Sequence, residues 1–150
     1  MAIYYINVLV TGPKEVGKTS YINRTITGHF TNTNNNNNVL EYNSNKGKVY
    51  INFVDENDST SSIDYTILML NNIKNIDEWV KETSPDVICF TKNDINENKL
   101  TYDDINELFS KNINTLKYEI SSKSQYNLEK PVLTILKKHL HTDEVFYVNN

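Results

Sequence analysis

The most informative stretch of this sequence is Gly12-Pro13-Lys14-Glu15-Val16-Gly17-Lys18-Thr19. It fits the pattern G-x-x-x-x-G-K-[ST] of a phosphate-binding loop. Directly before it, residues 3–10 form an apolar, β-branched and aromatic run that predicts a buried strand. Residues 20–26 can continue as a helix, with Tyr21, Ile22 and Ile26 on one face. Because a strand precedes the motif and a helix follows it, a coincidental glycine–lysine turn is the less favoured alternative.

A loop between a strand and a helix directs backbone N–H groups, and the positive end of the helix dipole, towards one point where phosphate can bind. We expect Lys18 to reach the β- and γ-phosphates and the Thr19 hydroxyl to ligate Mg²⁺. Lys18 is therefore the candidate catalytic residue. The predicted phosphate contacts are Gly12, Glu15, Val16, Gly17, Lys18, Thr19 and Ser20.

Length and composition restrict the class of protein. A chain of 150 residues most simply forms one domain, 1–150, with a sizeable core. Its formal net charge of −4 does not support a nucleic-acid-binding or membrane-binding surface. No apolar run approaches the ~20 residues that span a bilayer, and no signal-peptide pattern is present, so we expect no membrane anchor. The single cysteine, Cys89, lies in an apolar run and is expected to be a buried structural thiol, which fits a reducing, intracellular compartment.

The rest of the chain alternates predicted strands with predicted helices. Residues 39–42 and 48–55 predict a hairpin in which Val49, Ile51 and Phe53 share one face. Further strands are predicted at 63–70, 87–90 and 116–120, and helices at 72–83, 101–111 and 127–140, with the asparagine-rich residues 29–38 as a loop. Trp79 is expected to pack along its helix, the alternative being an exposed binding tryptophan. This order predicts an α/β fold of the P-loop NTPase type: a mostly parallel sheet, one antiparallel hairpin and helices on both faces.

Ligands of such folds bind at the carboxyl ends of the strands, so two more strand ends are candidate contacts. Thr91-Lys92-Asn93-Asp94 follows the strand 87–90. The Asp94 carboxylate can accept hydrogen bonds from the N1–H and 2-amino groups of guanine, which adenine does not offer, and the Lys92 stem can lie across the base. Ser121-Ser122-Lys123 follows the strand 116–120, where backbone N–H groups could meet the guanine 6-oxo group. Either motif alone could be an ordinary polar turn, but the three motifs in this order predict one guanine-nucleotide site. Its base contacts would be Thr91, Lys92, Asp94, Ser121, Ser122 and Lys123.

The sequence resembles the small GTPases of the Ras superfamily, and among them the Ran family. The stretch Ser121-Ser122-Lys123-Ser124-Gln125-Tyr126-Asn127-Leu128-Glu129-Lys130-Pro131 is similar to S-A-K-S-N-Y-N-F-E-K-P of that family. Thr27-Gly28-His29-Phe30 resembles its T-G-E-F, Asn45-Lys46-Gly47 its N-R-G, and Lys74-Asn75 with Trp79 its third helix. The resemblance covers nearly the whole chain. It implies a monomeric G domain that binds GDP and GTP with Mg²⁺. It also implies a link to nucleocytoplasmic transport, with transport receptors and an exchange factor as partners and a cytoplasmic or nuclear location.

The sequence departs from that family where the family switches. The asparagine tract takes the place of the first-switch threonine, so Thr31 or Thr33 would ligate Mg²⁺ only if the loop re-routes. The second switch, D-x-x-G-Q in the family, is Asp55-Glu56-Asn57-Asp58-Ser59 here. Asp55 is a candidate for holding a Mg²⁺-bound water, whereas Ser59 replaces the glutamine that orients the attacking water. Asp58 replaces the glycine that meets the γ-phosphate; a carboxylate about 4 Å from that phosphate repels it by ~4 kcal/mol at a dielectric of 20, which favours GDP over GTP.

Other departures lie in the phosphate loop and after Leu140. Lys14 and Glu15 replace two glycines of the family, and the side chain of Lys14 would crowd the hydrolytic water. The family's C-terminal switch helix and acidic tail are expected to be absent. A shortened copy of a cellular regulator in an asparagine-biased sequence is also compatible with a viral source.

We therefore expect a protein that binds guanine nucleotide, favours GDP and hydrolyses GTP weakly or not at all. The alternative is a nucleotide-free pseudo-GTPase that acts as a protein-binding module or as a decoy for Ran partners. A P-loop kinase of a small substrate is the least favoured class, because no lid with arginines is recognisable and Arg24 is the only arginine.

Overall fold

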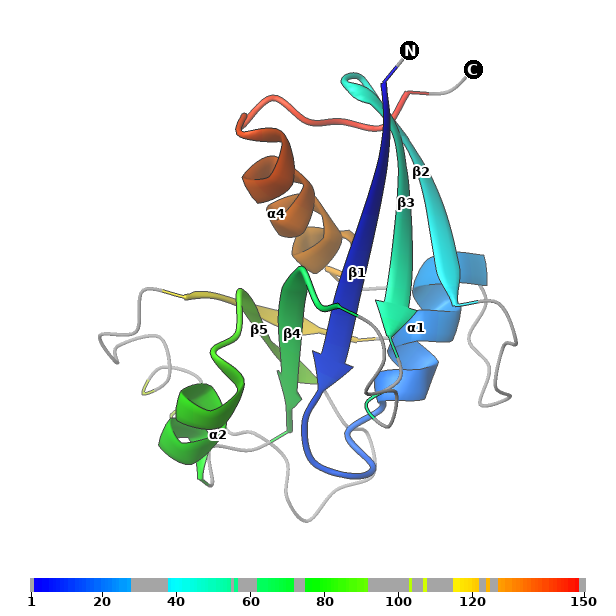
Figure 1. Cartoon of the computed structure of the whole chain (residues 1–150). Coiled ribbons are helices and arrows are strands. Elements are labelled where there is room, and N and C mark those ends of the chain that lie inside the picture. Colours follow the sequence, from blue (N-terminus) through cyan, green and yellow to red (C-terminus); the bar gives the residue numbers. More distant parts are fainter. Residues whose placement is uncertain are drawn as a thin grey trace.

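The computed structural model describes residues 2–27, 38–54, 56, 62–71, 75–91, 103, 107, 115–121, 124 and 127–148. In chain order these residues form β1 (Ile3–Thr11), α1 (Lys18–Thr27), β2 (Val39–Ser44), β3 (Gly47–Val54), β4 (Tyr65–Leu70), α2 (Ile76–Thr83), β5 (Val87–Thr91), β6 (Leu116–Ile120) and α4 (Glu129–Leu140). The strands make one six-stranded sheet in the order β2-β3-β1-β4-β5-β6 (Figure 1). All neighbouring strands run parallel except β2 and β3, so the predicted mostly parallel sheet with one antiparallel hairpin is confirmed.

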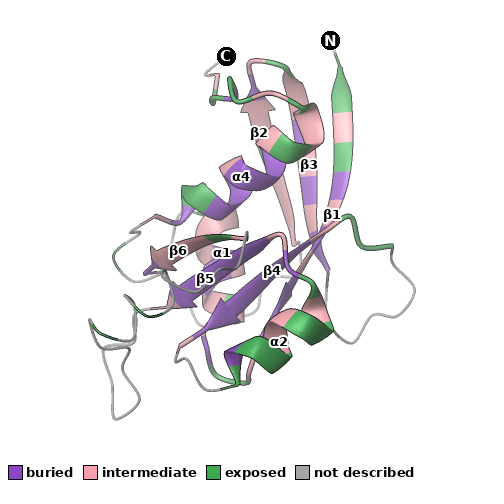
Figure 2. Ribbon diagram, turned by 90° about the vertical axis from the view of Figure 1, so that its left-hand side faces the viewer, coloured by how far each residue is buried: buried purple, intermediate pink, exposed green. Residues whose placement is uncertain are grey.

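Helices cover both faces of the sheet. Successive residues of a strand point to opposite faces, so the strands contribute side chains to two separate cores. The larger core contains side chains of α1 and α4 together with Val8, Val10, Val49, Ile51, Phe53, Ile67, Met69, Val87 and Cys89. The smaller core joins α2, through Ile76, Trp79 and Val80, to Leu68, Leu70, Ile88 and Phe90. Figure 2 shows β4 and β5 buried along most of their length between these two layers. The prediction that Trp79 packs along its helix is confirmed.

Burial controls the ionisation of two side chains in the larger core. Cys89 is fully buried in β5, and burial raises the pKa of its thiol above the usual range. Tyr21 of α1 packs edge-on against Phe53, with 6.4 Å between the ring centroids. Burial also raises the pKa of the Tyr21 hydroxyl well above the ordinary value of a phenol. The prediction that Cys89 is a buried structural thiol is therefore confirmed.

Two helices begin later than predicted, because an asparagine in the left-handed conformation precedes each. Asn75, with φ 60°, lies directly before α2, and Asn127, with φ 55°, lies two residues before α4. The side-chain amide of Asn127 also donates to the backbone oxygen of Glu119 at 3.1 Å. Asparagine tolerates this backbone conformation better than most residues do. The helix predicted at 101–111 lies outside the described residues except for Asp103 and Glu107, both of which are helical.

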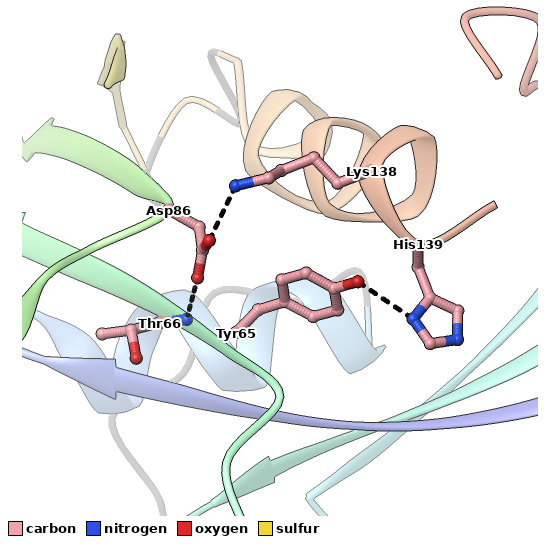
Figure 3. Close-up of polar contacts among 5 residues, drawn as sticks. All are labelled: Tyr65, Thr66, Asp86, Lys138 and His139. Atoms are coloured by element: carbon pink, nitrogen blue, oxygen red, sulfur yellow. Dashed lines mark hydrogen bonds and ion pairs between the residues drawn. The ribbon is translucent and has the colours of Figure 1, made fainter. Parts of the chain in front are cut away.

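Polar contacts tie the amino ends of β4 and β5 to α4 (Figure 3). Asp86 lies just before β5, and one of its carboxylate oxygens accepts the Thr66 N–H at 2.9 Å. The other accepts the Lys138 ammonium group at 2.7 Å. The Tyr65 hydroxyl lies 3.0 Å from Nδ1 of His139. These contacts hold α4 over the sheet at the edge opposite to the carboxyl ends of the parallel strands.

After α4 the chain returns to the tip of the β2–β3 hairpin, a contact that we did not predict. Tyr147 forms an antiparallel bridge with Ser44. The Asn45 N–H donates to the backbone oxygen of Phe146 at 3.1 Å, and the side-chain oxygen of Asn45 accepts the Phe146 N–H at 3.0 Å. Val145 is buried beside them in the larger core. Figure 1 shows this segment in red, crossing from the end of α4 to the hairpin.

Candidate phosphate-binding site

Gly12 brings the start of the phosphate loop against the neighbouring strand. Its φ is 147°, and a Cβ at this position would lie 2.1 Å from the backbone oxygen of Met69 in β4. Only glycine fits such an approach without a shift of backbone, and only glycine adopts this φ readily. The loop lies at the carboxyl end of β1 and leads directly into α1 (Figure 1).

The second half of the loop contains two residues with positive φ. Glu15 (φ 64°) and Gly17 (φ 95°) are both left-handed, and Val16 between them is buried. The Tyr21 N–H donates to the backbone oxygen of Gly17 at 2.9 Å, so α1 begins at Lys18, inside the motif rather than after it. N–H groups in the first turn of a helix have no partner within the helix, and left-handed residues before it favour a concave run of N–H groups.

The side chain of Lys18 folds back over the loop. Its Nζ donates to the backbone oxygen of Gly12 at 2.7 Å and lies 2.5 Å from Oε1 of Glu56. The Lys18 side chain is 21% exposed and the Glu56 side chain 38%. An ammonium group has three N–H donors, so these two contacts to described residues leave one donor for a further acceptor.

Lys18 and Thr19 line a pocket of about 350 Å³ at the carboxyl ends of β1 and β3. The other lining residues are Val10, Lys14, Ile22, Asn23, Asn38, Phe53, Val54 and Glu56. The volume lies in the range of small-ligand sites. Lysine ammonium groups and the N–H groups of a helix start suit phosphate. The Thr19 hydroxyl and the Glu56 carboxylate are oxygen ligands of the kind that Mg²⁺ accepts.

Three polar residues of this pocket, Asn23, Asn38 and Glu56, were not predicted as contacts, and among them only Glu56 is charged. It follows the predicted strand 48–55 directly, and β3 pairs in parallel with β1 so that Val54 is level with Leu9. This register brings the residues just after β3 to the same edge of the sheet as the loop after β1. The signal was therefore present in the sequence as a carboxylate directly after a strand that was predicted to lie in the same sheet.

Thr91 is the last residue of β5, and Ser121 comes directly after the neighbouring parallel strand β6, at this same edge. Thr91 pairs with Ile120, and Ser121 follows directly, with its Oγ accepting the Ser124 N–H at 3.3 Å. Since β4 lies between β1 and β5, and strands lie about 4.8 Å apart, β5 and β6 are about 10 Å and 14 Å from β1. The predicted contacts Asp55, Lys92, Asp94, Ser122 and Lys123, and the switch residues Thr31, Thr33, Asp58 and Ser59, lie outside the described residues.

A larger pocket, of about 520 Å³, lies at the opposite edge of the sheet beside α4. Its main polar groups already bond to one another. Lys138 pairs with Asp86 at 2.7 Å, and the Tyr118 hydroxyl lies 2.9 Å from Oγ1 of Thr134. These groups hold α4 to the sheet, so the smaller pocket at the phosphate loop is the better candidate site.

Within the described ranges, no group of three or more histidine, cysteine, aspartate and glutamate side chains could hold a metal ion. None of the helices described has the length and apolar character needed to cross a bilayer. A comparison with protein-family models finds no match for this sequence.

Proposed function

We propose that this chain is a Ran-like G domain, of the P-loop type, that binds a guanine nucleotide with Mg²⁺, prefers GDP to GTP and hydrolyses GTP slowly or not at all. The observation that carries the proposal is the loop between β1 and α1. Its glycine conformations, its lysine folded over the loop and its threonine in the same pocket match what a phosphate site requires.

The phosphate half of the proposed site consists of residues that the structure describes. Lys18 has one ammonium N–H left for a phosphate oxygen, and the N–H groups at the start of α1 add uncharged donors. Thr19 would hold Mg²⁺ through its hydroxyl, and the bound ion would neutralise phosphate charge. These residues bind and orient the diphosphate. Lys18 is also the residue that would stabilise charge on a transferring phosphoryl group.

The guanine half of the proposed site lies at the ends of β5 and β6. Asp94 is three residues beyond Thr91, and Lys123 is two residues beyond Ser121. A nucleoside diphosphate can span the strands between β1 and β6. The Asp94 carboxylate would pair with two donors of guanine, whereas adenine would leave that carboxylate without a partner, which gives discrimination between the bases.

Negative charge around Lys18 supports the proposed preference for GDP. Glu56 lies against the lysine, and Asp58 is two residues further along the sequence. A phosphate charge about 4 Å from one carboxylate is repelled by ~4 kcal/mol at a dielectric of 20, and solvent screening lowers this value for a side chain as exposed as Glu56. Slow hydrolysis is proposed because Ser59 stands where the family has the glutamine that orients water.

Calorimetric titration of the full chain with GDP and with ATP, each with Mg²⁺, tests the proposal. We expect binding of GDP and none of ATP. Lys18→Ala should weaken GDP binding by about 10- to 100-fold, since it removes a charged hydrogen-bond donor. Lys130→Ala is the matched control, because Lys130 is an exposed lysine of α4 outside the pocket. No binding of GDP at micromolar protein would refute the proposal.

Hydrolysis is tested separately, in a single-turnover assay with GTP. The expected rate constant is no greater than the ~10⁻⁴ s⁻¹ of an unassisted small GTPase. A rate constant well above this value would contradict the proposed loss of water orientation and leave the binding proposal intact.

The Lys18–Glu56 ion pair also favours a second candidate, a nucleotide-free pseudo-GTPase that serves as a protein-binding module. In that case Glu56 takes the place of a phosphate permanently. Thermal unfolding with and without GDP separates the two functions, because a ligand that binds only the folded state raises its melting temperature. An unchanged melting temperature at saturating GDP would favour the pseudo-GTPase.

A further inference from the structure

We propose that Glu56 is the residue that makes this site select a nucleoside diphosphate over a triphosphate, an assignment that rests on the proposed guanine-nucleotide function. The sequence interpretation gave this role to Asp58. The contacts of the described residues point instead to Glu56, whose carboxylate is the group that lies against the lysine of the loop.

The number of donors on Lys18 limits how many acceptors it can bind at once. Its ammonium group has three N–H donors. One is directed to the backbone oxygen of Gly12 at 2.7 Å, and a second meets Oε1 of Glu56 at 2.5 Å. The remaining donor can serve one phosphate group. A diphosphate can therefore bind while the Glu56 contact persists, whereas a triphosphate, which needs the lysine for both its β- and γ-phosphates, requires Glu56 to leave.

The position of Glu56 is set by buried residues just before it. Phe53 and Val54 end β3 and are both buried, and both line the pocket together with Glu56. Because only one residue separates Val54 from Glu56, the backbone of Glu56 stays beside the pocket as long as the end of β3 is in place. A third phosphate at Lys18 would then lie near a carboxylate that stays close by, and like charges repel.

A second ion pair in the chain provides a control for this argument. Glu41 and Lys48 pair at 2.9 Å across the β2–β3 hairpin, and neither lines the pocket at the phosphate loop. Replacing Glu41 removes the same charge and the same kind of contact as replacing Glu56. Any effect that is particular to Glu56 therefore arises from its place beside Lys18.

The experiment measures dissociation constants for GDP and GTP with Mg²⁺ by calorimetry, for the wild type and for Glu56→Gln, Glu56→Ala, Glu41→Gln and Asp58→Asn. The nucleotide is analysed after each titration to verify that GTP is intact. We expect both Glu56 variants to lower the ratio of the GTP to the GDP dissociation constant by about tenfold or more, the effect of one charge in a partly screened position. Glu41→Gln should leave the ratio unchanged.

The assignment is overturned if the Glu56 variants keep the wild-type ratio, or if they tighten GDP and GTP by the same factor. It is also overturned if Asp58→Asn alone lowers the ratio. In each of these cases binding of GDP by the wild type would leave the proposed function standing. Failure of every protein to bind either nucleotide would refute the proposed function, and the assignment with it.

Discussion

Replacement of Gly12 by alanine tests the close approach of the phosphate loop to the sheet. The new Cβ would lie 2.1 Å from the backbone oxygen of Met69, whereas ordinary contacts begin at 3.4 Å, so the two backbones would have to separate by about 1.3 Å. Met69 is fully buried in β4, which is paired with β1 on one side and β5 on the other. The strand therefore has little room to move.

The expected loss of stability has two parts. A strained φ contributes about 1–3 kcal/mol, and the forced contact in a packed region adds about 1–3 kcal/mol, for a total of about 2–6 kcal/mol. Gly17→Ala is the matched control, because Gly17 also has a positive φ, 95°, but a Cβ there would meet nothing within 4 Å. This control should lose only the part due to φ, about 1–3 kcal/mol.

Urea unfolding followed by the fluorescence of Trp79, the only tryptophan, measures both variants. With a denaturant slope of about 2 kcal/mol/M, Gly12→Ala should lower the urea midpoint by about 1–3 M and Gly17→Ala by about 0.5–1.5 M. Equal losses in the two variants would show that Gly12 does not press against β4. The position that the loop takes in the fold would then be wrong.

Three further predictions concern the core and the far edge of the sheet. Cys89 is buried and its thiol pKa is raised by burial, so a thiol reagent should label it only under unfolding conditions; rapid labelling in native buffer would contradict its place in β5. Asp86→Asn should lower the free energy of unfolding by about 1–3 kcal/mol, because it weakens a contact to the backbone of β4 as well as the pair with Lys138. Lys138→Met should lower it by no more than about 1 kcal/mol, since it removes only the ion pair. Equal losses in the two variants would argue against the backbone contact. Burial raises the pKa of Tyr21, so the folded chain keeps this proton above pH 10 while the unfolded chain loses it. The contribution of this hydroxyl to stability should be complete below pH 10 and decrease above it. Tyr21→Phe should therefore reduce the loss of stability between pH 9 and pH 10.5 in urea titrations.

Much of the sheet could be predicted because its signals are local. The apolar runs gave β1, β5 and β6 almost to the residue, and the alternation of Val49, Ile51 and Phe53 gave the hairpin strand β3. A strand of a parallel sheet covered on both faces is apolar throughout, which is easy to recognise in a sequence. The helix starts were less accurate, since the left-handed conformations of Asn75 and Asn127 depend on how the chain enters each helix.

The candidate site also has a part that is local in the sequence and a part that depends on distant residues. The motif Gly12 to Thr19 is a local signal, because the turn needs its glycines and the phosphate needs its lysine within a few residues of one another. The Lys18–Glu56 contact is different, because it joins the first residue of α1, which follows β1, to a residue just after β3, and the two are brought together only by the parallel pairing of β1 and β3.

The amino-acid order alone was enough to give the alternation of strands and helices, the phosphate loop between the first two elements, and the guanine-nucleotide hypothesis. Only the tertiary structure showed that the Glu56 carboxylate contacts Lys18. It also showed that the C-terminal segment returns to the hairpin, where Phe146 and Asn45, 101 positions apart in the sequence, form a hydrogen bond. The reason is physical: backbone conformation and burial follow from neighbouring residues, whereas the pairing of distant polar groups depends on strand register, which is set by the packing of the whole sheet.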